Sequence, residues 1–251
     1  QKPVFAVYSS FLQRAYDQIL HDVCLQNLPV VFAIDRAGIV GSDGETHQGL
    51  FDISYLMTIP NITLLAPKNK WEFSDMIKFA IDCGRPAAIR YPRGEAFDGL
   101  MQYRAPVEYA KSETLYEAGS VVLLAYGSMV KTALDVRERL KQAGVDCALV
   151  NMRFAKPLDT QMLDHVSKSY RLAVTMEENV KTGGIGEAVA AYLRTAGSNA
   201  GLLHIAVEDT FLPHGNVEVL RRQAGLDAES IVQKINGWLQ NQQMQPEAGG
   251  S

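Results

Sequence analysis

The sequence predicts an α/β protein made of two consecutive three-layer α/β domains, each a largely parallel sheet with helices on both faces. β-branched runs such as Pro29–Ile34 and Ser120–Ala125 lack polar alternation, as do strands that are covered on both sides. These runs alternate with segments of helical spacing. The alternation stops near Gly94 and restarts after Glu117, and a chain of 251 residues is long enough for two cores.

The elements of the first half follow from short apolar runs and from apolar residues at helical spacing. Asn69 is a suitable N-terminal cap for one helix, and Pro92 closes the last strand. We expect strands at Val4–Tyr8, Pro29–Ile34, Thr63–Ala66 and Ala87–Tyr91, and helices at Phe11–Cys24, Phe51–Ile59 and Lys70–Cys83.

The second half repeats the strand and helix alternation, and Gly144 is a typical stop for its first helix. We expect strands at Ser120–Ala125, Cys147–Asn151, Arg171–Glu177 and Leu203–Val207, and helices at Met129–Ala143, Asp159–Lys168, Ile185–Ala196 and Ala228–Gln240. The predicted organisation is a domain at 1–94, a linker at 95–117, a domain at 118–240 and a polar, disordered tail at 241–251.

Composition excludes several classes of protein. The chain is 47% hydrophobic and 21% charged, which is typical of a globular protein rather than a disordered one. A net charge of −4 argues against nucleic acid or an anionic membrane as a partner, and no apolar run is long enough to span a bilayer. Cys24, Cys83 and Cys147 have no metal or disulfide spacing, so we expect buried thiols and a cytoplasmic location.

The N-terminus has no initiator Met and no signal-peptide pattern, and Val4–Tyr8 already has the pattern of a buried strand. We therefore expect the chain to be a fragment whose first domain is truncated at its N-terminus.

The segment Asp35–Gly49, with the sequence DRAGIVGSDGETHQG, carries the strongest chemical signal. It follows a buried strand, and open α/β sheets bind ligands at the carboxyl ends of their strands. Its glycines allow the backbone to approach a ligand closely. Asp43 and His47 have the spacing of a metal pair on a helix, but the glycines around them indicate a loop, so no metal site is predicted.

The pattern DRAG-x-x-G-x-DG-x-THQG resembles the active-site loop of the deoxyxylulose-phosphate synthases, and transketolases share its later part. YSSFLQRAYDQ (Tyr8–Gln18) and RYPRG (Arg90–Gly94) also resemble these synthases. NMRFAKPLD (Asn151–Asp159) and EEN-x-x-x-GG-x-G (Glu177–Gly186) resemble the transketolase C-terminal domain. The resemblance covers about residues 3–240.

The resemblance implies an enzyme that uses thiamine diphosphate and Mg²⁺. It would condense pyruvate with D-glyceraldehyde 3-phosphate to give 1-deoxy-D-xylulose 5-phosphate and CO₂, a precursor for isoprenoid, thiamine and pyridoxal synthesis. In this family a separate domain holds the diphosphate and the metal through a GDG motif. The chain has no GDG, and the glutamate that activates the cofactor would precede Gln1. We therefore expect a homodimer whose site needs the missing N-terminal domain, and an inactive fragment.

The resemblance also implies roles for individual residues at the cofactor and at the reacting carbons. Phe11 would stack on the aminopyrimidine, and Arg14 would border it. His47 would contact bound pyruvate or its adduct, and Asp43 would face a hydroxyl of the acceptor. An imidazole can donate or accept a proton near neutral pH, which suits this place.

Tyr8, Arg36 and Arg93 correspond to the residues of the family that bind the acceptor's phosphate. Two guanidinium groups can bind phosphate oxygens in bidentate fashion, and a phenol adds a neutral donor. Arg36 and Arg93 both follow predicted strand ends, so they should meet at one edge of the sheet.

Three other interpretations stay open. The chain could be part of a transketolase, or a 2-oxoacid dehydrogenase β-subunit, which would lack the diphosphate domain naturally. It could also be a non-catalytic domain that uses the fold to dimerise. Finally, the turn Gly183–Gly186 could bind phosphate, although close strand-to-helix packing is the expected reason for its glycines.

Overall fold

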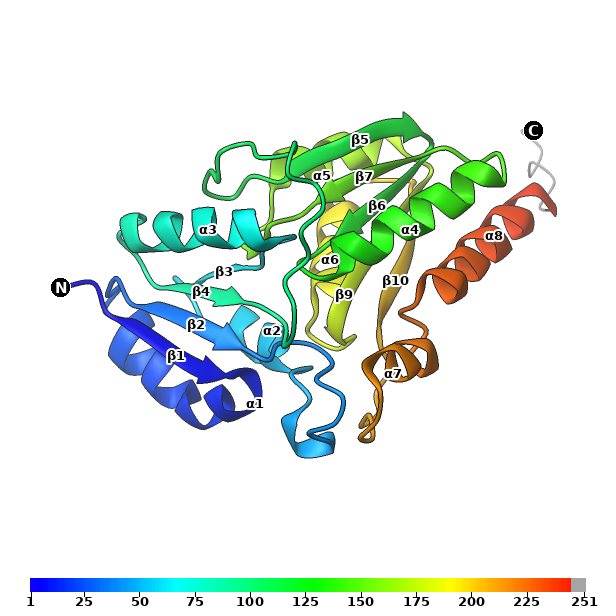
Figure 1. Ribbon diagram of the computed structural model, residues 1–251. Coiled ribbons are helices and arrows are strands. Elements are labelled where there is room, and N and C mark those ends of the chain that lie inside the picture. Colours follow the sequence, from blue (N-terminus) through cyan, green and yellow to red (C-terminus); the bar gives the residue numbers. More distant parts are fainter. Residues whose placement is uncertain (245–251) are drawn as a thin grey trace.

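The computed structural model describes residues 1–244, which form two five-stranded sheets with helices on both faces (Figure 1). The first sheet has the order β1-β2-β4-β3-β8, and the second has the order β10-β9-β6-β7-β5. The strands are β1 (Val4–Tyr8), β2 (Val31–Asp35), β3 (Thr63–Leu65), β4 (Ala87–Arg90), β5 (Glu113–Gly119), β6 (Val121–Ala125), β7 (Cys147–Asn151), β8 (Phe154–Lys156), β9 (Leu172–Val180) and β10 (Gly201–Val207). All pairs are parallel except β3–β8 and β5–β7.

Most of the helices lie where the apolar spacing predicts them, and the expectation of two α/β domains is confirmed. They are α1 (Ser9–Leu12), α2 (Asp52–Met57), α3 (Lys70–Asp82), α4 (Met129–Gln142), α5 (Thr160–Ser169), α6 (Ile185–Thr195), α7 (Val217–Gln223) and α8 (Ala228–Met244). As predicted, the side chain of Asn69 caps α3 by accepting the N–H of Glu72. Gly144 follows α4 with φ of 82°, the left-handed conformation that ends many helices.

The helix predicted at Phe11–Cys24 is irregular. After α1 the chain forms a 3₁₀ turn, η1 (Gln13–Ala15), and then a π-helix, η2 (Gln18–Cys24). The π geometry continues past the helix end, where the N–H of Leu28 donates to the carbonyl of Val23 at 3.0 Å.

Three elements were not predicted. Residues 113–117, which the sequence placed in the linker, belong to β5, so the linker is shorter than expected. β8 and α7 were also missed. The closing helix α8 reaches Met244 rather than Gln240, so the predicted tail begins too early, and its residues 245–251 lie outside the described range. No helix within residues 1–244 is long and apolar enough to cross a bilayer.

The hydrophobic core is shared by the two domains. Ile34 and Leu64 of the first sheet belong to the same buried cluster as Val122 and Leu124 of the second. The opposite face of each sheet has a separate cluster, formed with α3 on the first sheet and with α4 and α8 on the second. In Figure 1, α4 and α8 lie beside each other over the second sheet. The two sheets therefore pack as one body.

β8 connects the two domains directly. It belongs by sequence to the second half of the chain, yet it pairs antiparallel with β3 and completes the first sheet. Arg153, just before β8, has φ of 57°, and this left-handed residue turns the chain from the second sheet toward the first.

Buried charged groups reinforce this junction. Nζ of Lys68 lies 2.9 Å from Glu72 and 2.5 Å from Glu113, and the guanidinium of Arg153 lies 2.8 Å and 3.2 Å from the same two carboxylates. Asn151 also donates to Glu72 at 3.0 Å. Lys68 and Glu72 belong to the first domain, and the others belong to the second domain or lie at its junction with the first. The two cations balance the two anions, which buried charges require.

Replacing Arg153 with Leu is expected to destabilise the protein strongly, because Glu72 and Glu113 would lose a buried cation. The expected loss in free energy of unfolding is about 3–5 kcal/mol, measured by urea denaturation. Arg104→Leu is the matched control, because it breaks an exposed ion pair with Asp75 and should change stability little. Equal losses in the two variants would contradict the structural role given to the cluster.

Candidate active site

The predicted site residues gather at the carboxyl ends of the strands in the first sheet. Tyr8 is the last residue of β1 and pairs in register with Asp35, the last residue of β2. Arg36 follows β2 directly, and Arg93 follows β4 by three residues. Parallel strands place these ends on one edge of the sheet, so residues far apart in the sequence become neighbours.

Arg36, Asp43 and Arg93 form one charged group. The carboxylate of Asp43 accepts from Nη1 of Arg36 through one oxygen and from Nη1 of Arg93, at 2.8 Å, through the other. The guanidinium of Arg36 lies over the ring of Tyr8, 4.1 Å from its centroid. Arg36 has φ of 55°, and such backbone strain is typical of functional sites.

Phe11 connects this charged group to His47. Its ring is stacked on Tyr8 with centroids 5.6 Å apart and meets the imidazole of His47 edge-on at 5.4 Å. The guanidinium of Arg14 lies 5.4 Å from the same ring. Phe11 is 39% exposed, which leaves part of its ring open to a ligand. The structure thus brings all the predicted site residues together.

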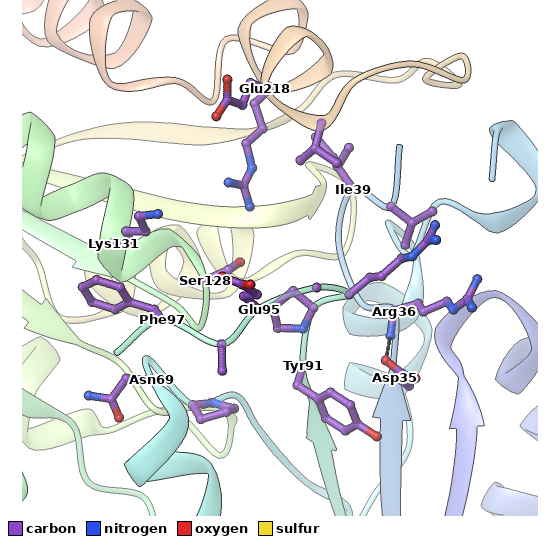
Figure 2. A pocket seen from close by; sticks show the side chains of 18 of the residues that line it. Asp35, Arg36, Ile39, Asn69, Tyr91, Glu95, Phe97, Ser128, Lys131 and Glu218 are labelled. Carbon is purple, nitrogen blue, oxygen red and sulfur yellow. Dashed lines mark hydrogen bonds between the residues drawn. The ribbon is translucent and has the colours of Figure 1, made fainter. Parts of the chain in front are cut away.

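A cavity of about 1110 Å³ opens beside Arg36 and Arg93, between the two domains (Figure 2). Tyr91 and Asn69 line it from the first domain, and Ser128, Lys131 and Glu218 line it from the second. Burial, with the nearby Asp35 carboxylate as a further cause, raises the pKa of Tyr91. The cavity is large enough for a phosphorylated metabolite.

The loop that carries Asp43 and His47 is closed at its base by paired backbone hydrogen bonds. Gly38 and Gly49 exchange both of their N–H groups, at 2.7 and 2.8 Å. The carbonyl of Gly49 also accepts Nη2 of the buried Arg90 at 3.3 Å. The backbone of Gly38 has φ of 84°, which favours glycine.

Arg90 holds this loop base against both domains. It forms a bidentate pair with Asp52 at 2.9 and 3.1 Å and donates to the backbone carbonyl of Glu178 at 3.1 Å. Burial alone would lower the pKa of Arg90, but the Asp52 carboxylate more than compensates and the pKa is raised. Arg90 therefore stays charged and links β4, α2 and β9.

The second domain supports the loop through Glu178. Its carboxylate accepts from the hydroxyl of Ser128 and from Nε of Arg221, both at 2.7 Å. The Glu178 carboxylate, despite burial, raises the pKa of Arg221. A Cβ at Gly38 would lie only 2.5 Å from Oε2 of Glu178.

Sequence reasoning missed Arg90, Asp52 and Glu178. The signals were present: an arginine at the end of the apolar strand AAIR and a glutamate in the run EEN. The turn Gly183–Gly186 is close packing, as expected, because the Glu177 carboxylate accepts the N–H groups of Ile185 and Gly186 and so fills the start of α6.

Two family models match the chain. Residues 1–97 match the transketolase pyrimidine binding domain, and residues 110–231 match the transketolase C-terminal domain. Together with the fold and the site, these matches show that the chain belongs to the transketolase family. Within that family its sequence is similar to the 1-deoxy-D-xylulose-5-phosphate synthases, as the following comparisons show.

The chain is 54% identical over 236 residues to the 1-deoxy-D-xylulose-5-phosphate synthase of Lachnoclostridium phytofermentans. This alignment covers 93% of this chain and 38% of that protein. It is 50% identical over 238 residues to the 1-deoxy-D-xylulose-5-phosphate synthase 2 of Geobacter sulfurreducens, with the same coverage of 93% and 38%. The chain thus spans less than two fifths of these curated relatives.

Solved structures share the fold. A split-gene transketolase, solved as an inactive β4 tetramer, superposes with a TM-score of 0.84 at 25% identity, over 94% of this chain and 75% of that one. The transketolase of Campylobacter jejuni has a TM-score of 0.76 at 18% identity, over 94% of this chain and 35% of that one.

Replacing Gly38 with Ala is expected to disturb the loop base, because the new Cβ would meet Glu178 in a backbone conformation that already disfavours Ala. Gly84→Ala is the matched control, since Gly84 also has positive φ but nothing lies within 4 Å of its Cβ position. The control should cost about 1–2 kcal/mol of unfolding free energy. Gly38→Ala should cost at least about 1 kcal/mol more in urea denaturation. Equal costs would mean that the contact with Glu178 does not matter.

Proposed function

We propose that the chain forms the pyrimidine-side half of the active site of a deoxyxylulose-phosphate synthase. The complete enzyme joins pyruvate to D-glyceraldehyde 3-phosphate, releases CO₂ and forms 1-deoxy-D-xylulose 5-phosphate. The observation that carries this proposal is the arrangement of Arg36 and Arg93 around Asp43, because both arginines line the cavity between the domains. The partly exposed ring of Phe11 is connected to this group through Tyr8. The identity to named synthases supports it.

The arginine pair is suited to the acceptor's phosphate. Each guanidinium uses Nη1 for Asp43, and within residues 1–244 their Nε and Nη2 groups donate to no other side chain or carbonyl. Free N–H groups of two guanidiniums can bind phosphate oxygens, while Asp43 keeps the two groups at a fixed separation. The ring of Tyr8 packs against the guanidinium of Arg36 and so helps to fix its position.

The residues present fit the pyrimidine end of thiamine diphosphate. The exposed part of the Phe11 ring offers a flat apolar surface, and Arg14 borders it. Thiamine diphosphate, when bound, supplies an electron sink for the two-carbon unit that remains after pyruvate loses CO₂. In this proposal the diphosphate and Mg²⁺ are held by another part of the enzyme, as the resemblance of the sequence implies.

His47 is the proton donor of the proposal. Its ring touches Phe11, and Nδ1 lies 2.9 Å from the hydroxyl of Thr46, which holds the orientation of the imidazole. At the edge of Phe11 it can reach the carbonyl oxygen of pyruvate or of the acceptor and give it a proton. Asp43 lies on the same loop and faces a hydroxyl of the acceptor.

The proposal includes a homodimeric enzyme in a reducing cytoplasm. The free thiols of Cys24, Cys83 and Cys147 are consistent with that compartment. The neighbouring structure of a split-gene transketolase supports the idea that a chain of this kind works together with a separately encoded half, and that it is inactive without it.

His47→Ala is expected to lower turnover by roughly 10²–10⁴-fold, because general acid and base groups contribute about that much. The assay follows deoxyxylulose phosphate formed by the complemented protein, meaning this chain combined with a diphosphate-binding segment from a related synthase. His21→Ala, an exposed histidine paired with Asp17, is the matched control. Near-normal turnover of the His47 variant, or turnover by the chain without the added segment, would contradict the proposal.

Arg93→Ala is expected to raise the KM for glyceraldehyde 3-phosphate by about tenfold or more, since a lost charged hydrogen bond costs about 1.5–3 kcal/mol. The KM for unphosphorylated glyceraldehyde should stay nearly the same, because that acceptor has no phosphate to bind. Arg104→Ala is the surface control. If the KM values of both acceptors rose equally, a phosphate-binding role for Arg93 would be wrong, and a transketolase-type acceptor would need to be tested.

A further inference from the structure

Gln48 is a buried polar residue that none of the roles above uses. It follows His47 directly and is only 3% exposed. Its Oε1 accepts the N–H of Val40 at 2.9 Å, and its Nε2 donates to the carbonyl of Pro213 at 3.0 Å. One planar amide therefore connects the two arms of the active-site loop with the second domain.

The segment around Pro213 packs closely on the same loop. The N–H of Gly215 donates to the carbonyl of Gly41 at 3.3 Å. A Cβ at Gly41 would lie 2.8 Å from both the carbonyl oxygen of Gly215 and Cγ2 of Val217. The second domain thus contacts the loop at Gly41, which lies in the sequence between the proposed site residues Arg36 and His47.

We propose that Gln48 is a positioning residue, which fixes His47 and Asp43 by holding their loop against Pro213 of the second domain. The C-terminal domain then forms part of the support of the site, through residues 213–217. This inference rests on the proposed function for its catalytic consequence, but the anchoring itself is a property of the chain alone.

The anchoring requires a group that both accepts and donates. Gln48→Glu keeps the shape of the side chain, but its ability to donate a hydrogen bond depends on whether the carboxyl is protonated. A protonated carboxyl can accept from Val40 and donate its hydroxyl to the carbonyl of Pro213, so it replaces the amide. An ionised carboxylate has no donor, and one of its oxygens would face the carbonyl oxygen of Pro213.

Burial would raise the pKa of the introduced carboxyl. The carboxylates of Glu45 and Asp52 line the same small cavity as Gln48, and Arg90 neutralises Asp52. Tyr55 also lines this cavity, and His214 follows Pro213 directly in the facing segment. His214 and His47 are present in both proteins, so the comparison of the variant with the wild type isolates the change at position 48.

The first experiment measures backbone hydrogen exchange in the chain alone. At pH 5.5, residues 38–49 of Gln48→Glu should exchange as in the wild type. At pH 8.5 they should exchange about tenfold faster or more, because the buried bond is lost. Helix α4 should exchange equally in the two proteins. Equal exchange in the loop at both pH values would overturn the inference.

The second experiment measures turnover in the complemented protein. The ratio of kcat for Gln48→Glu to kcat for wild type should fall about tenfold between pH 6 and pH 8.5. Gln161→Glu, the same change at an exposed helix position, should give a flat ratio. A flat ratio for Gln48→Glu with an active wild type would reject the positioning role of Gln48 and leave the proposed function standing. An inactive wild type would reject the proposed function, while the exchange result would still decide the anchoring.

Discussion

The candidate site depends on the ion pair and the hydrogen bonds that the buried guanidinium of Arg90 makes. It links α2 through Asp52, the loop base through the carbonyl of Gly49, and the second domain through the carbonyl of Glu178. A buried cation needs partners on several sides, and here those partners come from α2, from the loop and from the second domain. The position of the loop is therefore determined by long-range contacts rather than by its own glycines.

The charged group at the cavity follows from that arrangement. Because the loop is held, Asp43 lies between Arg36 and Arg93, which come from the ends of two different strands. The aromatic residues Tyr8 and Phe11 extend the group toward His47. A pocket built in this way is preorganised, so a ligand would not need to gather these side chains itself.

The sequence predicted the central strands and most helices, because apolar periodicity is a local signal. The resemblance of the sequence motifs selected site residues that the structure brings together, and their roles stay predictions. It did not predict β8, which is three residues long and forms only because β3 offers an edge. β5 was hidden for a similar reason, since the run ETLYEAG is half polar and becomes a strand by pairing with β7. Gln48 and Glu178 were missed because their partners lie more than 100 and about 50 residues away, in Pro213 and Ser128 respectively.

The crossing of β8 into the first sheet has a consequence for how this polypeptide can be divided. The two family models meet between residues 97 and 110, and a break there would still leave the first sheet dependent on a strand encoded after it. A gene fission at this boundary would release a sheet with an unprotected edge, and it would separate Glu72 from Arg153 and Lys68 from Glu113. The first sheet is therefore complete only when both domains fold as one unit.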